Sequence, residues 1–272
     1  MSARVAVVQF PGVNCEAESV RALMRAGLSA EVFRWTRPAA ELLAYDAYLL
    51  PGGWSYQDRV RAGALAAKDP LVDVLADVAA AGRPIIGICN GAQVLVEAGL
   101  VPGDGRVSLA LARNRMPQRN GYYARWVYCR IEASNSVFTR HLEPGMVLPL
   151  PIAHGEGRFT SAKRGHVASL VRSGQVPLRY CTALGEDAIE FPSNPNGAEA
   201  GVAAVCNAAG NVLAIMPHPE RVLDLGAIGR SVGGPWGRLR SQAMAQNPTE
   251  VFSDAPGLQI FEGLKRHLEV AV

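Results

Sequence analysis

The chain has 272 residues, of which 49% are hydrophobic and 19% are charged, so it can bury a large core and is not a disordered chain. Lys and Arg outnumber Asp and Glu by 27 to 24, and a net charge of +3 is too small to indicate a nucleic-acid or membrane partner. This length fits one large α/β domain, which we expect to span residues 1–272. The five cysteines are odd in number and lack C-x-x-C spacing, which favours a reducing, cytoplasmic location and predicts neither disulfides nor a metal site.

The N-terminal part of the chain alternates strand and helix patterns. An apolar run at 5–10 predicts the first strand, and Asn14 is placed to cap a helix that turns Val20, Leu23 and Met24 inward. Further strands are predicted at 30–35, 47–50 and 84–88, with a helix at 71–78 before the last of them. Continuous apolar strands separated by helices are typical of a mostly parallel sheet with helices on both faces. The sequence therefore predicts an α/β fold.

Beyond residue 107 the pattern changes to strands joined by turns, which predicts extra antiparallel strands. The apolar segments lie at 124–132, 146–152 and 202–216, and a final helix is expected at 258–268. The stretch 200–219 carries one charge-free run, but its Asn, Gly and Pro residues divide it into two short strands, so we expect no membrane span. The segment 226–257 is rich in Gly, Pro, Ser and Asn and is predicted to be an inserted loop or flap.

One segment has the pattern of a nucleophile elbow with Cys in place of Ser. The buried strand at 84–88 runs into Gly87-Ile-Cys89-Asn-Gly91 and then directly into a helix. Glycines flank the nucleophile because it lies in a strained turn, and the helix start favours a thiolate. A buried structural cysteine is the alternative interpretation. Cys89 is thus the candidate nucleophile.

A thiol nucleophile needs a base and a group that orients the base, and His218 and Glu220 offer both at the end of an apolar strand. In an extended chain, residues two apart point to the same side, so Glu220 is expected to hold the His218 ring. A glycine pair, Gly52 and Gly53, ends another predicted strand and lets a backbone N–H approach a ligand closely. The N–H groups of Gly53 and Asn90 are candidate oxyanion-hole donors, with an ordinary glycine turn as the alternative.

Together these segments resemble the class I, triad-type glutamine amidotransferases, whose elbow reads G-x-C-x-G-x-Q and whose His and Glu come from H-P-E. Longer motifs are similar to the glutaminase subunit of phosphoribosylformylglycinamidine synthase, in purine biosynthesis. These motifs are Phe10–Cys15, Pro51–Asp58 with Arg61–Gly63, Gly87–Gly91, Ile152–Arg158, Asn194–Gly197 and Met216–Arg221. The chain departs from the usual pattern at Trp54 and Gln57, where the family carries Phe and Gly, and by extra residues at 104–118 and 226–257.

The resemblance implies a flavodoxin-like class I glutamine amidotransferase fold. It also implies that Cys89, His218 and Glu220 form a triad that hydrolyses L-glutamine to glutamate and ammonia through a cysteinyl thioester. The ammonia would pass to a synthetase subunit that amidates formylglycinamide ribonucleotide, and a small accessory subunit is expected in the same complex. No phosphate loop or Mg-binding carboxylate set is apparent, so we expect no cofactor in this chain and place ATP and Mg²⁺ on the synthetase partner.

Several residues are expected to hold the glutamine substrate. They are Gly52, Gln93, His154, Gly155 and Glu156. Gln93 falls on the inner turn of the elbow helix, and the last three match the segment that lines the glutamine pocket in the family. For His154 a structural role in the loop is an equal alternative. Cys15 lies at a helix start, where it could be reactive, but we expect it to have a packing role.

The sequence leaves three other functions open. A cysteine hydrolase acting on an ester or lactone would explain the elbow but not Asn90, Gln93 and the H-P-E segment. A non-enzymatic flavodoxin-like binding protein would require these motifs to be relics. An amidotransferase for another acceptor, such as a guanine or cytidine nucleotide, would share the same triad.

Overall fold

The computed structural model describes residues 2–270, and its central feature is a nine-stranded sheet. The strand order is β2-β1-β3-β4-β11-β10-β9-β6-β7. These strands are β1 (Arg4–Gln9), β2 (Ser29–Arg34), β3 (Ala47–Leu50), β4 (Ile85–Ile88), β6 (Tyr123–Ile131), β7 (Val147–His154), β9 (Leu178–Cys181), β10 (Val202–Cys206) and β11 (Val212–Ile215). Strands β2, β1, β3, β4 and β11 are parallel, and the remaining four extend the sheet through antiparallel pairs. The predicted parallel sheet with extra antiparallel strands is confirmed.

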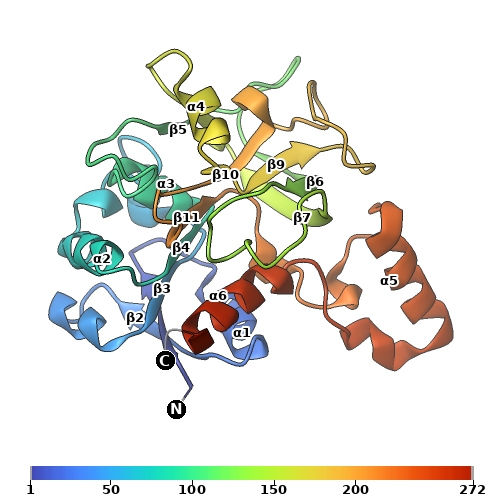
Figure 1. The fold of residues 1–272 in the computed structure, drawn as a ribbon, viewed down its shortest axis with the longest axis horizontal. Coiled ribbons are helices and arrows are strands. Elements are labelled where there is room, and N and C mark those ends of the chain that lie inside the picture. The colour runs from blue at the N-terminus through green and yellow to red at the C-terminus, as the bar shows by residue number, and fades with distance from the viewer. Residues whose placement is uncertain (1, 271–272) are drawn as a thin grey trace.

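Helices cover both faces of the parallel part of the sheet. They are α1 (Glu16–Arg25), α2 (Pro70–Ala80), α3 (Asn90–Glu97), α4 (His166–Arg172), α5 (Gly234–Gln246) and α6 (Leu258–Val270). Figure 1 shows α1 beside α6 on one side of the parallel strands, and α2 and α3 on the other. Two short strands, β5 (Ala110–Ala112) and β8 (Arg158–Thr160), form a separate antiparallel pair. Between residues 2 and 270, no helix combines the length and the apolar character that crossing a membrane requires.

The strand order places loops from distant parts of the sequence at one edge of the sheet. Strands β3, β4 and β11 are buried at every residue, as expected for parallel strands covered on both faces. The chain moves from β1 to β2 in one direction and then returns to place β3 on the other side of β1. In such doubly wound sheets, ligands bind outside the carboxyl ends of the strands, near the point where the order reverses. The loops after β1, β3 and β4 meet at this edge.

Helix α1 differs from the prediction at its start and on its inward face. Cys15 is the N-cap residue, and neither it nor the predicted Asn14 makes a side-chain capping hydrogen bond. The buried residues are Ser19, Ala22 and Leu23. Met24, predicted to point inward, is 60% exposed. The reason lies in the tertiary structure: Cys15 N donates to the Gly52 carbonyl (3.2 Å), which fixes the helix start against the loop after β3 and sets the inward face.

The segment 226–257, predicted to be a loop, is largely helical. It begins within the 3-10 turn η6 (Leu225–Ala227) and contains α5 and a second 3-10 turn, η7 (Pro248–Phe252). Within α5 the buried residues are Gly237 and Ala243, so the helix lacks the apolar stripe by which helices are recognised in a sequence. Trp236 Nε1 donates to the Val147 carbonyl (3.2 Å) and anchors the helix start to β7. The rest of α5 projects away from the sheet (Figure 1).

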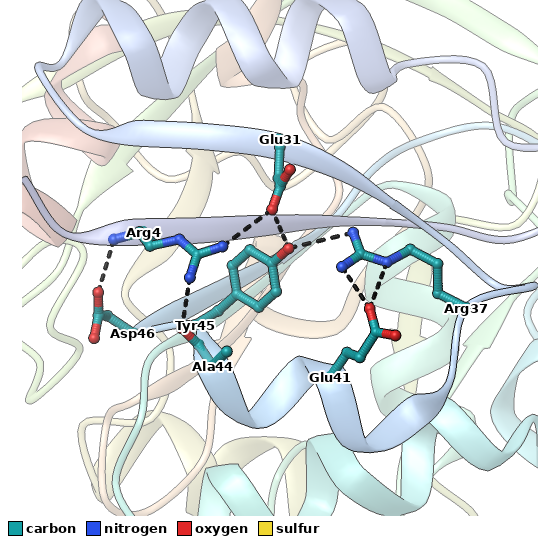
Figure 2. Close-up of polar contacts among 7 residues, drawn as sticks. All are labelled: Arg4, Glu31, Arg37, Glu41, Ala44, Tyr45 and Asp46. Atoms are coloured by element: carbon teal, nitrogen blue, oxygen red, sulfur yellow. Dashed lines mark hydrogen bonds and ion pairs between the residues drawn. The ribbon is translucent and has the colours of Figure 1, made fainter.

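A polar network joins the first two strands to the connection before β3 (Figure 2). The Glu31 carboxylate on β2 accepts hydrogen bonds from Arg4 Nη2 on β1 (3.3 Å) and from the Tyr45 hydroxyl. Arg37 pairs with Glu41 within the connection (2.7 Å). These ion pairs are largely exposed, so each stabilises the fold by about 1 kcal/mol or less. Arg4 is the first residue of β1, so this network lies away from the carboxyl edge of the sheet.

Candidate active site

Loops that follow β1, β3, β4, β7 and β11 enclose a cavity of about 170 Å³ at the carboxyl edge of the parallel strands. The predicted site residues that line it are Gly53, Cys89, Gln93, His154, Gly155, Glu156 and His218. Gly52, Asn90 and Glu220 lie next to these lining groups and contact them. The fold thus brings together all of the residues that the sequence suggested for one site.

Cys89 lies in a strained turn between β4 and α3. Its φ and ψ are 53° and −103°, in a region that residues with a side chain rarely adopt. A Cβ on Gly91 would lie 1.9 Å from the Leu50 carbonyl oxygen, and a Cβ on Gly87 would lie 2.5 Å from the Gly91 oxygen. Both glycines are needed because α3 packs directly against β3 and β4. The turn holds Cys89 Sγ at the cavity, 3.6 Å from the Ala153 carbonyl oxygen.

Replacing Gly91 with alanine is expected to destabilise the fold by about 3 kcal/mol, the upper part of the usual range for overpacking. The added methyl group would collide with the backbone of Leu50, which cannot move without disturbing β3. Urea unfolding measures the loss. Gly233→Ala is the control, because its Cβ would meet nothing closer than 3.6 Å, and we expect it to change the unfolding free energy by less than about 0.5 kcal/mol. Equal losses in the two variants would contradict the prediction.

His218 and Glu220 meet as expected, but the predicted extended geometry was wrong. Pro219–Arg221 forms the 3-10 turn η5, and within it His218 Nδ1 lies 2.5 Å from Glu220 Oε1. The chain bends here because His218 N donates to the Pro151 carbonyl (2.8 Å) and the following residues turn away from the strand direction. Both side chains are buried. With Nδ1 engaged by the carboxylate, Nε2 has no hydrogen-bond partner among residues 2–270 and is left for a group in the cavity.

The two buried histidines of the cavity have opposite pKa shifts. Burial alone would lower the pKa of His218, but the Glu220 carboxylate and the sulfurs of Cys89 and Cys15 outweigh it and raise this pKa well above its usual value. The His218 ring therefore favours the imidazolium form. For His154, burial and then the charge of His218 lower the pKa to about 3, so this ring is neutral near pH 7. His154 Nδ1 lies 3.1 Å from Asn114 Oδ1, which fixes the ring in its loop.

The glycine pair after β3 leaves no room for side chains. A Cβ on Gly52 would lie 2.8 Å from His218 Cε1 and 3.5 Å from Cys89 Cβ. Gly53 has a φ of +145°, and a Cβ there would lie 2.6 Å from Val13 Cα. The backbone of this loop consequently approaches both the thiol and the imidazole closely, which only glycine permits.

Asn90 and Gln93 connect the elbow helix α3 to two neighbouring loops. Asn90 Oδ1 accepts a hydrogen bond from Ser55 N (3.0 Å), and Asn90 Nδ2 donates to Gln93 Oε1 (2.9 Å). Gln93 Nε2 in turn donates to the Glu156 carbonyl oxygen (2.7 Å). Gln93 lines the cavity, and its amide also fixes the loop after β7.

Cys15, for which we favoured a packing role over reactivity, lines the cavity. It is buried, and Arg221 Nη2 donates a hydrogen bond to its sulfur (3.0 Å), while Arg221 Nε binds Glu18 Oε1 (2.8 Å). Three side chains meet here within 4.8 Å of one another: the Cys15 thiol, the His218 ring and the Glu220 carboxylate. The last two form the His218–Glu220 contact described above. The cavity therefore contains a second thiol beside the imidazole.

Other lining residues were also absent from the predicted site. They are Asn14, Trp54, Asp58, Ala62, Tyr122, Ala153 and Arg221. Asp58 and Arg221 lie inside the long motifs Pro51–Asp58 and Met216–Arg221, so those motifs carried a signal for them. Tyr122 lies outside every motif, and only the pairing of β6 with β7 brings it to the cavity.

Comparisons with known proteins place the chain in a family. The family profile of the CobB/CobQ-like glutamine amidotransferase domain matches residues 2–252. Phosphoribosylformylglycinamidine synthase subunit PurQ of Methanothrix thermoacetophila is 43% identical over 98% of both chains, and that of Thermus thermophilus is 42% identical over 81% of this chain and 90% of the relative.

Solved structures agree with this placement. PurLQS from Thermotoga maritima matches with a TM-score of 0.71 at 30% identity, covering 98% of this chain and 100% of that chain. A Thermoplasma acidophilum protein described as part of a GMP synthase shares the fold at 13% identity, with a TM-score of 0.54 over 100% of this chain and 96% of that chain. The chain therefore belongs to the CobB/CobQ-like glutamine amidotransferase family and, within it, to the PurQ glutaminase subunits of phosphoribosylformylglycinamidine synthase, an enzyme of purine biosynthesis.

Proposed function

We propose that Cys89, His218 and Glu220 are the catalytic triad with which this glutaminase hydrolyses L-glutamine to glutamate and ammonia. The observation that carries the proposal is the buried 2.5 Å contact between His218 Nδ1 and Glu220 Oε1, next to a cysteine in a strained elbow on the same cavity. A thiol, a histidine and a carboxylate that orients the histidine are the groups that nucleophilic acyl transfer requires.

The reaction begins when the Cys89 thiolate attacks the side-chain carbonyl carbon of glutamine. Negative charge moves to the carbonyl oxygen, which the N–H groups of Gly53 and Asn90 stabilise. The His218 imidazolium gives its proton to the amide nitrogen, the C–N bond breaks, and ammonia leaves behind a glutamyl thioester. Neutral His218 then takes a proton from water as that water attacks the thioester. The thiolate departs, glutamate is released, and His218 is again protonated.

The rest of the substrate contacts the other lining groups. Gly52 keeps the β3 loop close to the reacting carbon, and Gln93, His154, Gly155 and Glu156 surround the amino-acid end of glutamine. His154 lines the pocket as a neutral ring and does not act as a general acid, since its pKa of about 3 means that it is not an imidazolium near pH 7.

Amide hydrolysis by a thiol needs no phosphoryl donor, so this chain uses no cofactor for its own step. ATP and Mg²⁺ belong on a synthetase subunit, which amidates formylglycinamide ribonucleotide with the ammonia. The similarity to the PurQ relatives and to the Thermotoga maritima PurLQS structure supports a complex with this synthetase and a small accessory subunit. Ammonia passes from this chain to the synthetase subunit through a channel inside the protein complex.

The location and the domain organisation complete the proposal. All five cysteines are free and buried thiols, which suits a reducing compartment, and we assign the chain to the cytoplasm.

We treat residues 1–272 as one glutamine amidotransferase domain, with 226–257 as an insertion that docks against a partner subunit. The projecting helix α5 supports this role for the insertion.

Mass mapping after exposure to a glutamine-mimicking diazoketone tests the proposed function. We expect one label per chain at Cys89, and we expect excess glutamine to prevent it. Cys15 is the internal control, because it lines the same cavity without being the proposed nucleophile. Labelling at Cys15, or labelling that glutamine does not prevent, would contradict the proposal. The experiment is run with and without the synthetase subunit, so that a pocket completed by the partner is detected.

A further inference from the structure

Five arginines lie close together beside the mouth of the cavity, and we call them the basic rim: Arg113, Arg115, Arg119, Arg125 and Arg158. Three of them meet where the loop between β5 and β6 passes the start of β8. Arg158 Nε donates to the Arg113 carbonyl oxygen (3.2 Å). A Cβ on Gly197 would lie 3.0 Å from Arg115 Cβ and 3.8 Å from Arg158 Cδ, so these two side chains run past the same point.

The other two arginines of the basic rim pack on one tyrosine. Arg119 lies over the Tyr123 ring, 4.7 Å from its centroid. Arg125 Nη1 donates a hydrogen bond to the Tyr123 hydroxyl (2.8 Å). The start of β6 therefore holds both guanidinium groups at one place.

A single loop joins the two halves of the basic rim and places them next to the cavity. Asn114 Nδ2 donates to the Gly121 carbonyl oxygen (3.4 Å). Both residues line a surface hollow of about 520 Å³ together with Arg113. This hollow shares Gly155 and Glu156 with the cavity that contains Cys89, so the basic rim borders the cavity.

The positive charge of the basic rim is largely uncompensated. Arg113 Nε lies 3.8 Å from Glu156 Oε1, and across residues 2–270 it is the one rim arginine with a carboxylate within 4.0 Å. Burial and then the charge of Arg115 lower the pKa of Arg158, as expected for cations held together without counter-charges. The whole chain carries a net charge of only +3, so the rim is a local concentration of charge. Such a patch favours association with a surface of opposite sign.

Two half-exposed aromatic side chains adjoin the basic rim. Trp54 and Tyr122 stack with their ring centroids 6.2 Å apart and their planes at 28°, and they are 46% and 48% exposed. Both line the cavity, so this aromatic pair lies at its mouth. Arg119 Nη2 donates to the Tyr122 carbonyl oxygen (3.3 Å), which joins the pair to the rim.

The composition of this surface is that of a protein–protein interface. Trp, Tyr and Arg are enriched at the centres of such interfaces, whereas Asp and Glu are depleted there. Single-stranded nucleic acids instead need open aromatic faces on which bases stack. Trp54 and Tyr122 stack on one another, and Arg119 covers Tyr123, so each ring already has one face occupied. A protein with an acidic surface is therefore the partner that this surface fits best.

We propose that the basic rim and the aromatic pair form the surface on which an acidic face of the synthetase subunit docks. Docking there covers the mouth of the cavity, so that ammonia released at Cys89 enters the complex and is not lost to bulk water. This inference rests on the proposed function, which it deepens by assigning the face that the partner covers. It is independent of the role proposed for the insertion 226–257.

The test measures the Kd between this chain and the synthetase subunit by interferometry, at about 0.05 M and about 0.5 M salt. Arg115 and Arg119 are both exposed, and neither lines the cavity. Reversing both charges, in Arg115→Glu with Arg119→Glu, should weaken binding by about a hundredfold at low salt, mainly through slower association. The difference from wild type should shrink at high salt, because ions screen exposed charges.

The matched control is Arg21→Glu with Arg34→Glu, which makes the same change in charge at exposed positions on α1 and β2. Strand β2 is at the opposite end of the sheet from β6 and β7. The control should bind within about threefold of wild type. At saturating synthetase the rim variant should regain the wild-type kcat for glutamine hydrolysis, because its cavity is intact.

The outcomes separate the docking surface from the proposed function. Equal Kd values for the wild type and the rim variant at low salt would overturn the docking surface, whereas a wild-type chain that does not bind the synthetase would overturn the proposed complex. A short fluorescent single-stranded RNA is titrated in parallel. RNA binding that the rim variant loses, with synthetase binding unchanged, would assign the rim to nucleic acid and overturn the proposal.

A milder variant guards the test against a folding failure. Arg119→Gln removes one charge and one side chain's contact with Tyr123 at the surface, and it should weaken synthetase binding by about tenfold at low salt. Thermal unfolding of each variant shows whether the chain has folded. An Arg119→Gln chain that folds and binds as tightly as the wild type would count against the docking surface.

Discussion

Replacing Cys89 with alanine will lower kcat for glutamine hydrolysis by about 10⁴-fold or more, because no other group can form the thioester. The second thiol of the cavity, Cys15, cannot substitute for it. Cys15 is the N-cap residue of α1 and does not lie in a strand-to-helix elbow. Arg221 Nη2 donates a hydrogen bond to its sulfur, and burial raises the pKa of its thiol, so Cys15 holds its proton. Steady-state ammonia release by the complex with the synthetase measures the loss.

Added ammonium salt separates loss of chemistry from loss of structure in the Cys89→Ala complex. Because the proposed role of this chain is only to supply ammonia, amidation with external ammonia should continue at the wild-type rate. Cys206→Ala is the control, since Cys206 is buried on β10 away from the cavity, and it should retain glutaminase activity. If Cys89→Ala kept more than a few per cent of the glutaminase rate, Cys89 would not be the nucleophile.

Replacing Glu220 with glutamine will lower kcat by about 10³-fold or more, through its effect on His218. The carboxylate orients the imidazole through the 2.5 Å contact with Nδ1 and is the main group that keeps the pKa of His218 high despite burial. Without that charge, burial dominates and the pKa of His218 falls. Ammonia departure needs the protonated ring, so the high-pH limb of the kcat profile should move to lower pH in Glu220→Gln.

Glu199→Gln is the control for this variant, because Glu199 is exposed in the 3-10 turn before β10. It should leave both kcat and the pH profile unchanged. A Glu220→Gln enzyme whose kcat fell with no movement of the high-pH limb would mean that Glu220 only supports the local fold. The amount of thioester intermediate, measured by rapid quenching and mass spectrometry, then tells whether thioester formation or thioester hydrolysis is slowed.

Local sequence patterns determined the parallel half of the fold and the elbow. Continuous apolar runs gave β3 and β4 to within one residue of their observed bounds, since strands buried on both faces have no polar residues to interrupt the pattern. The glycines around Cys89 were informative for the same local reason, because a strained turn between a strand and a packed helix admits no other residue. Helix α5 was missed because it lacks an apolar stripe, and Met24 was placed wrongly because α1 turns to suit the loop after β3.

The sequence by itself identified the family and the candidate triad. Both depend on short motifs of consecutive residues, the elbow around Cys89 and the His-Pro-Glu segment, which can be recognised without knowing the fold. Only the tertiary structure showed which further side chains line the cavity beside the predicted ones. Cys15, Asp58 and Tyr122 come from three separate parts of the chain, and no spacing along the sequence relates them to Cys89. The order of the strands brings them together, since loops at the carboxyl ends of neighbouring parallel strands meet at one edge whatever their separation in the chain.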